Sequence, residues 1–181
     1  MKKDLQFSVH KDRELKPLWE ELSHEGRYVL TASSLLQQEH GIDVILQGYD
    51  EDAEKELDIT VDTKHVRGQY SSFYLEEMSC TTPGKEKDGW LLKEDGWPDY
   101  IYYCYWPQCE GCKDKLCDDC EKELESKVYV IEYVPLRNWF LRNRTDYLLS
   151  TNKYTVNRTT GRLVPVADLG GLILEVYGYP E

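Results

Sequence analysis

Two aspartates and a lysine interrupt runs of the sequence that otherwise have the composition of buried strands. Asp43 lies in the run GIDVIL, and Asp62 and Lys64 lie in the run LDITVDTKHV. A charged group in an apolar interior destabilises the fold unless a metal ion, an ion pair or a cleft surrounds it. Because side chains alternate faces along a strand, Asp62 and Lys64 share one face, which Asp43 can reach if the two runs pair as antiparallel neighbours. The pattern predicts two carboxylates and one ammonium group at one edge of a sheet.

This group of side chains has the composition of a site that hydrolyses phosphodiesters. Two carboxylates can hold Mg²⁺ or Mn²⁺, which binds the scissile phosphate and lowers the pKa of a coordinated water. A neighbouring lysine would orient that water or stabilise the developing charge. A third carboxylate is available in FYLEEMS, where either Glu76 or Glu77 must face the same side of the sheet as Asp62. The structural alternative places Asp62 and Lys64 on the solvent face of an amphipathic strand.

The elements expected around these residues are mostly strands. Runs rich in Ile, Val and Tyr predict strands over 42–49, 57–66, 71–79, 98–106 and 127–134, and the acidic DEDAEKE forms a hairpin loop between the first two. Apolar residues at three- and four-residue spacing and helix-end signals predict helices over 12–26, 31–41 and 135–144. The tail from 161 to 179 combines a short helix with a last extended segment. We therefore expect one domain over residues 1–181, an α/β protein with a mixed central sheet flanked by helices.

With these strands in place, GIDVIL, the polar hairpin and VDTK resemble the core signature of the PD-(D/E)XK nuclease superfamily, in which an Asp on one strand precedes an (Asp/Glu)-x-Lys on the next. Asp43 matches the first acidic position, Asp62 the second and Lys64 the lysine. The superfamily often has a further glutamate on a preceding helix, for which Glu20 and Glu21 are candidates.

The continuation is similar to uncharacterised phage and bacterial members of that superfamily. The segments that carry this likeness are FYLEEMS, the Gly89-Trp90 pair, DYIYYCYW, LRNWF and TTGRLVPV. The resemblance implies a restriction-endonuclease-like fold and makes Glu76 the matching acid. It also implies a magnesium-dependent endo- or exodeoxyribonuclease that cleaves DNA with Asp43, Asp62, Lys64 and Glu76.

Four cysteines form a local cluster with paired spacing. Cys109-x2-Cys112 precedes Cys117-x2-Cys120 by four residues, and four thiolates satisfy tetrahedral Zn²⁺. The cluster predicts a structural zinc knuckle inserted over residues 104–125. An iron–sulfur cluster or a redox dithiol is the weaker alternative. The remaining cysteines, Cys80 and Cys104, lie on strand-like segments, where a free buried thiol is the default expectation.

The net charge of -12 argues against general attraction to nucleic acid. A local basic stretch with interleaved aromatic residues is compatible with a surface that faces phosphates, although solvated arginines on a helix and loop explain it as well. The rival function is a non-catalytic acidic protein on the same scaffold, either docking a partner or mimicking DNA. A protein partner and a homodimer both stay open. The basic residues are Arg137, Arg142, Arg144, Lys153, Arg158 and Arg162.

The first residues, MKKDLQFSVHKDRELK, contain no apolar segment of the kind that begins a secretory signal. No stretch of the chain approaches the ~18 apolar residues that span a bilayer. The sequence therefore predicts a cytoplasmic protein with no membrane partner.

Overall fold

The computed structural model describes residues 28–32, 41–50, 54–68, 70–94, 98–106, 127–152 and 158–178. Several sequence-based expectations lie outside these residues: the helix over 12–26 with Glu20 and Glu21, most of the helix over 31–41, the cysteines Cys109, Cys112, Cys117 and Cys120, and the basic residue Lys153. The described strands are β1 (Tyr28–Ala32), β2 (Val44–Asp50), β3 (Lys55–Arg67), β4 (Ser72–Cys80), β5 (Lys87–Asp88), β6 (Tyr100–Trp106), β7 (Lys127–Glu132), β8 (Leu148–Asn152), β9 (Thr159–Pro165) and β10 (Ile173–Tyr177). The described helices are α5 (Tyr133–Asn143) and the short 3-10 turns η1 (Arg144–Asp146) and η2 (Val166–Leu169).

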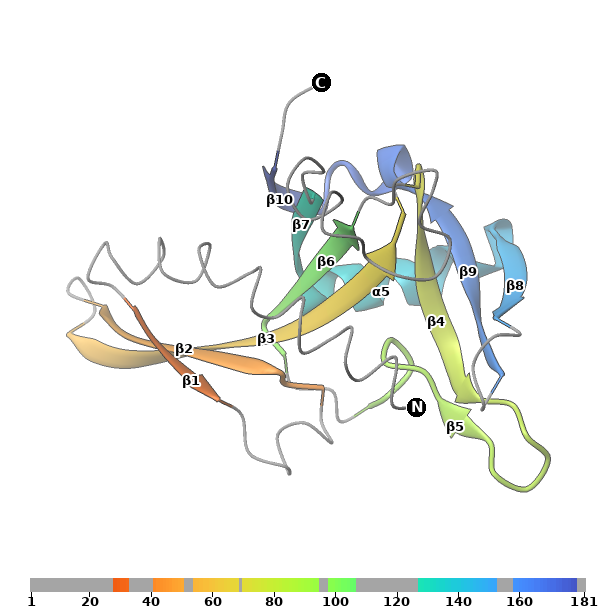
Figure 1. Ribbon diagram of the computed structural model, residues 1–181, viewed down its shortest axis with the longest axis horizontal. Coiled ribbons are helices and arrows are strands. Elements are labelled where there is room, and N and C mark those ends of the chain that lie inside the picture. Colours follow the sequence, from red (N-terminus) through yellow and green to blue (C-terminus); the bar gives the residue numbers. More distant parts are fainter. Residues whose placement is uncertain are drawn as a thin grey trace, which may run out of the picture.

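The strands form two sheets (Figure 1). The larger has the order β1-β2-β3-β6-β7-β10 and is mixed, because β3 and β6 are parallel whereas the other neighbours are antiparallel. The smaller is antiparallel, with the order β5-β4-β9-β8. The chain is therefore mixed α/β, as predicted, but the expectation of one central sheet was wrong. The strand that carries FYLEEMS, β4, joins the second sheet, and helices are few among the described residues.

The two sheets enclose a core of aromatic and aliphatic side chains. Phe73 of β4 lies with its ring centroid 4.4 Å from that of Tyr103 on β6, and Tyr103 accepts a hydrogen bond from the Tyr74 N–H at 2.9 Å. Helix α5 follows β7 directly and contributes Leu136 and Phe140, which are fully buried. Burial of this face fixes the distance between the sheets. Its members are Phe73, Leu75, Leu91, Ile101, Tyr103, Tyr105, Tyr129, Ile131, Tyr133, Leu136, Phe140, Val164 and Leu169.

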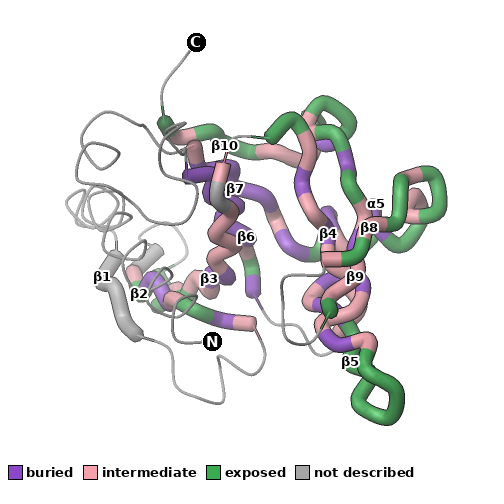
Figure 2. The backbone as a smooth tube through the Cα atoms, turned by 45° about the vertical axis from the view of Figure 1, so that its right-hand side comes forward, coloured by how far each residue is buried: buried purple, intermediate pink, exposed green. Residues whose placement is uncertain are grey.

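A second cluster covers the opposite face of the larger sheet. Cys104 and Trp106 of β6 lie there with Val61 of β3 and Val128 of β7. Figure 2 shows the backbone coloured by burial, with buried and intermediate residues along β6. Strands buried on both faces are apolar throughout instead of alternating, which explains the continuous runs YIYYCYW and KVYVIE. Cys104 and Cys80 are buried thiols that form no disulfide with another described residue, as predicted.

Local structure agrees with the sequence where the pattern is strong and differs where it is weak. β2 and β3 form the predicted antiparallel hairpin. The helix expected over 135–144 begins two residues earlier, so Pro135 lies in its first turn, where the missing N–H has no intrahelical partner to lose. Thr31 and Ala32 belong to β1, so the helix expected to start there was wrong in its first residues. The described helices include none that is long and apolar enough to cross a membrane.

Gly89 permits a close approach between the turn after β5 and the strand β4. Its N–H donates to the Glu77 carbonyl oxygen at 2.6 Å, and a Cβ at this position would lie 2.4 Å from the Glu76 carbonyl oxygen. We expect Gly89→Ala to lower the free energy of unfolding by about 1–3 kcal/mol, because backbone atoms must move to admit the methyl group. Thermal denaturation should show a fall in Tm of about 2–4 °C for each kcal/mol.

Gly171→Ala is the matched control, since a Cβ there would meet nothing within 4 Å. Equal melting temperatures for the two variants would contradict the assignment of a close contact at Gly89.

Candidate functional site

Strand β3 changes partners along its 13 residues. Its first half pairs with β2 as far as Val61, which lies opposite Val44. From Val61 to Arg67 it pairs with β6 in parallel. Asp62 and Lys64 therefore lie just beyond the end of the β2–β3 pairing, where the hairpin meets the two-sheet body (Figure 1).

Asp62 and Lys64 face the second sheet and not the solvent. Lys64 Nζ lies 5.2 Å from the centroid of the Trp90 ring, and Val66 on the same face packs against the core between the sheets. His65 faces the other way, where its Nδ1 accepts a hydrogen bond from Trp106 Nε1 at 3.0 Å. The predicted alternation is confirmed. The structural alternative of a solvent face is wrong, because only 3% of Asp62 is exposed.

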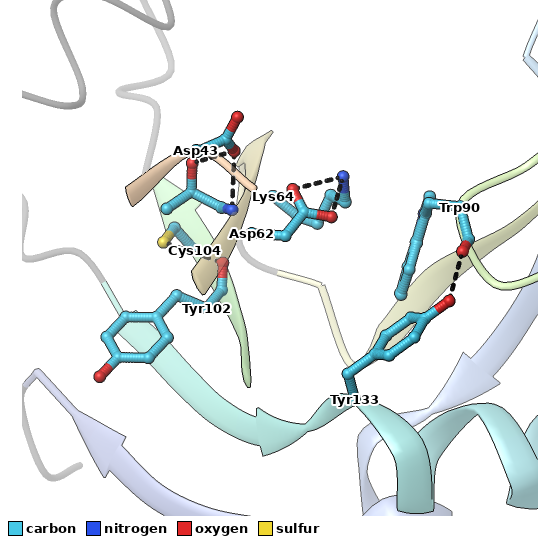
Figure 3. A network of polar contacts seen from close by, with 8 residues as sticks. Asp43, Asp62, Lys64, Trp90, Tyr102, Cys104 and Tyr133 are labelled. Atoms are coloured by element: carbon cyan, nitrogen blue, oxygen red, sulfur yellow. Dashed lines mark hydrogen bonds and ion pairs between the residues drawn. The ribbon is translucent and has the colours of Figure 1, made fainter. Parts of the chain in front are cut away.

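Asp62 and Lys64 form a direct ion pair, which explains how two charged side chains can lie within an apolar strand. Lys64 Nζ lies 2.6 Å from Asp62 Oδ2 and donates to Oδ1 at 2.8 Å (Figure 3). The Asp62 side chain is 4% exposed and that of Lys64 26%, so the carboxyl group is enclosed and the lysine side chain is half-buried. The pair is charge-neutral by itself, which makes burial at this position tolerable.

Asp43 occupies the turn into β2 and binds the neighbouring edge of β3. Its N–H donates to the Val61 carbonyl oxygen at 2.9 Å, which continues the ladder by one residue. Its Oδ2 accepts hydrogen bonds from the N–H of Thr63 at 2.9 Å and from the Thr63 Oγ1 at 2.8 Å (Figure 3). Asp43 thus lies across the strand pair from Asp62 and is itself exposed.

The electrostatics of Asp62 show that the two aspartates are neighbours. Burial raises the pKa of Asp62 to about 7, Lys64 opposes this shift, and both the charge of Asp43 and a hydrogen bond to its side chain raise the pKa further. For Lys64, burial lowers the pKa, but the attraction of Asp62, with smaller contributions from Asp43 and Glu76, outweighs it, so the pKa is raised. Two carboxyl groups and one permanently charged ammonium group therefore share one small region.

Glu76 lies close enough to Lys64 for the two charges to act on each other, and both residues line one cavity. Burial raises the pKa of Glu76, and the charges of Lys64 and Lys93 oppose that shift. The adjacent Glu77 takes a different role, since its Oε1 lies 3.0 Å from Arg162 Nε and 3.7 Å from Arg144. Of the two glutamates in FYLEEMS, the structure brings Glu76 to the site.

The basic residues do not all face one free surface. Arg162 and Arg144 are engaged with Glu77, and Arg162 also donates to the Tyr147 carbonyl oxygen at 2.9 Å. Arg142 is exposed on α5, and Arg158 is exposed just before β9. Arg137 is half-buried, and its Nε has no hydrogen-bond partner among the described residues.

The described part of the chain contains no group of three or more histidine, cysteine, aspartate or glutamate side chains arranged to hold a metal ion. Asp43 and Asp62 form a pair of neighbouring carboxyl groups instead. Mg²⁺ is commonly held by one or two carboxylates together with several waters. Asp43 and Asp62 are the two neighbouring carboxyl groups that such an ion would need, and no third acidic side chain of the described residues joins them in a metal-binding group.

Trp90 is the residue that the sequence analysis did not place in the site. In the sequence it stands out only as part of a Gly-Trp pair, yet its ring faces the Lys64 ammonium group (Figure 3). Its carbonyl oxygen accepts a hydrogen bond from the Tyr133 hydroxyl at 3.0 Å. The contact joins residues far apart in the sequence, so spacing alone carried no signal for it.

Comparisons of this chain with protein-family models, with curated proteins and with solved structures found no match.

Proposed function

We propose that this protein is a metal-dependent nuclease that hydrolyses DNA phosphodiester bonds. The observation that carries the proposal is the buried Asp62–Lys64 ion pair with Asp43 beside it, at the point where β2 ends and β3 continues. Perturbed carboxyl groups next to a fixed positive charge are typical of sites that do chemistry, although structural ion pairs also perturb pKa values.

Each residue has a distinct role in the proposed reaction. Asp43 and Asp62 would hold Mg²⁺ or Mn²⁺, and the ion would supply charge neutralisation of the phosphate and a water of lowered pKa. Lys64 keeps its proton at neutral pH because its pKa is raised, so it serves as a fixed positive charge near the phosphate and not as a base. Glu76, whose charge acts on Lys64, would help to orient that ammonium group.

The finer features of the sequence analysis belong to the same proposal. We infer a restriction-endonuclease-like arrangement around β2 and β3, and a structural zinc ion held by Cys109, Cys112, Cys117 and Cys120, because four thiolates at this spacing form a closed tetrahedral site. Reduced thiolates and a DNA substrate would both suit an intracellular compartment. DNA contacts would then rest mainly on the exposed Arg142 and Arg158.

The test is a cleavage assay with supercoiled, linear and single-stranded DNA in the presence of Mg²⁺ or Mn²⁺. We expect the wild-type chain to cut at least one substrate and Asp62→Asn to cut none, at equal zinc content. Asp58→Asn is the matched control: it lies on the same strand, is exposed, and accepts a hydrogen bond from Gln47 at 3.1 Å, away from the ion pair. Cutting by Asp62→Asn at the wild-type rate would refute the proposed site.

A second candidate function is favoured by one observation. The Lys64 ammonium group itself balances the charge of Asp62, and the chain carries a net charge of -12. Both features suit a non-catalytic accessory protein that binds a basic partner. Absence of cleavage of all three substrates by folded, zinc-loaded wild-type protein would favour this function.

A further inference from the structure

An open cavity of about 510 Å³ lies beside the ion pair, between the second half of β3 and the second sheet. Its walls come from five strands and from the turn after β5, so segments from across the fold converge on it. The lining residues are Thr63, Lys64, His65, Val66, Tyr74, Glu76, Trp90, Tyr103, Asn152 and Thr159.

We propose that this cavity receives one unpaired nucleotide of a DNA strand, so that the substrate of the site is single-stranded DNA or a frayed strand end. The inference rests on the proposed nuclease function and specifies its substrate class.

The size of the cavity favours a single nucleotide over a duplex. Its volume falls within the range of about 300–1,000 Å³ that small-ligand sites occupy. In a duplex each base is stacked and paired between two backbones, so no base can enter a space of this volume between two packed sheets while it stays in the duplex. A nucleotide must leave the base stack to reach the cavity, which is cheapest in DNA that is already unpaired.

The chemistry of the walls suits a base better than a phosphate group. Trp90 and Tyr74 supply aromatic surface on which a base can stack, and such stacking tolerates every base because each has a π-face. The Tyr133 hydroxyl donates to the Trp90 carbonyl oxygen at 3.0 Å, which anchors the backbone that carries the ring. Asn152 and Glu76 add polar groups that can bond to base edges, while the negative charge of Glu76 would repel a phosphate placed beside it.

The cavity is continuous with the proposed active site. Lys64 lines the cavity and also contacts Asp62, which itself lies outside the lining. A base held against Trp90 would therefore leave its phosphate near the Lys64 ammonium group, on the side of the two aspartates. This places the scissile group where positive charge is available, without moving either sheet.

The test is binding of two labelled DNAs, a ten-nucleotide single strand and a hairpin duplex of the same sequence, to the zinc-loaded chain without Mg²⁺ or Mn²⁺, measured by fluorescence anisotropy at one fixed salt concentration. We expect the wild-type chain to bind the single strand at least tenfold more tightly. Trp90→Ala should weaken single-strand binding about 5- to 150-fold, the effect of losing about 1–3 kcal/mol of stacking. Trp90→Phe, which keeps a ring, should lose much less.

The matched control is Tyr70→Ala, which removes an aromatic ring that is 59% exposed and lies outside the cavity lining. Equal binding of duplex and single strand by the wild-type chain would overturn the inference, and so would a Trp90→Ala effect no larger than that of Tyr70→Ala. The comparison of the two DNAs needs no variant, so it decides the matter even if Trp90→Ala does not fold. Binding is measured without Mg²⁺ or Mn²⁺, so it does not depend on cleavage. A failure of the nuclease proposal, seen as absence of cleavage, is therefore distinguished from a failure of this inference, seen as absence of a preference for single strands.

Discussion

Lys64→Met should lower the free energy of unfolding by about 2–3 kcal/mol at pH 9, because removing one partner of a buried ion pair leaves the other charge without compensation. The pKa of Asp62 beside Lys64 is about 7, so at pH 9 the ion pair holds the carboxyl group ionised, at about 1.4 kcal/mol for each pH unit above that value. Methionine keeps an unbranched apolar stem of similar length, so the change removes mainly the ammonium group. The carboxyl group of Asp62, 4% exposed, would then have to take up a proton or remain buried as an unpaired anion. Urea denaturation at pH 9, in a buffer without Mg²⁺ or Mn²⁺, measures the effect.

The double variant Asp62→Asn/Lys64→Met should be much less destabilised than the sum of the two single variants, since no buried charge is left unpaired. Lys55→Met, at the exposed start of the same strand, is the control for loss of a lysine from β3. A cost below about 1 kcal/mol for Lys64→Met, the value typical of surface pairs, would show that solvent already compensates Asp62.

Raising the pH from 4 to 8 should destabilise the wild-type chain relative to Asp62→Asn. The pKa of Asp62 is raised to about 7 in the folded chain, chiefly by burial, whereas an aspartate in the unfolded chain has a pKa near 3.9. Between these values the folded state binds more protons, so stability falls as the pH rises, by at most about 1.4 kcal/mol per pH unit for this one group. The contribution of Asp62 is complete below pH 4 and is lost as the pH passes through about 7.

Unfolding free energies of the two chains at half-unit steps of pH, in a buffer without Mg²⁺ or Mn²⁺, measure this difference. Glu76→Gln is a useful second reference, because the pKa of Glu76 is raised in the same direction and its titration adds to the same trend. A difference between wild type and Asp62→Asn that is flat from pH 4 to 8, or that grows with pH in favour of the wild type, would contradict the direction of the Asp62 shift.

Strand periodicity predicted the arrangement of Asp62 and Lys64 in this site. Alternation along β3 placed Asp62 and Lys64 on one face, and the acidic loop placed β2 beside β3 as an antiparallel neighbour, so both local relations follow from residues close together in sequence. Periodicity did not predict which part of the fold the Asp62 and Lys64 face of β3 would pack against. Trp90 and Glu76 reach Lys64 through the packing of one sheet on another, which no local spacing encodes.

The second sheet was the larger omission. Its strand β9 carries the polar run TTGRLVP, and its neighbour β8 leaves Leu148 72% exposed, so neither has the clean apolar alternation of a half-buried strand. Gly161 allows β9 to lie against β4, because a Cβ there would come within 2.6 Å of the Leu75 carbonyl oxygen. A glycine in a polar run is ordinarily a turn signal, and here it marks close pairing of strands.

The position of Asp43 has a consequence for solubility. Beyond Val61, no other described strand pairs with the side of β3 that β2 leaves, and an uncovered strand edge is a template for adding a strand from another molecule. The Asp43 carboxylate occupies the Thr63 N–H at the start of that edge and places a negative charge there, which discourages such pairing. A substitution at Asp43 is therefore expected to change the tendency of the chain to aggregate as well as its chemistry. Only a substitution that leaves the oligomeric state unchanged would report on the chemistry alone.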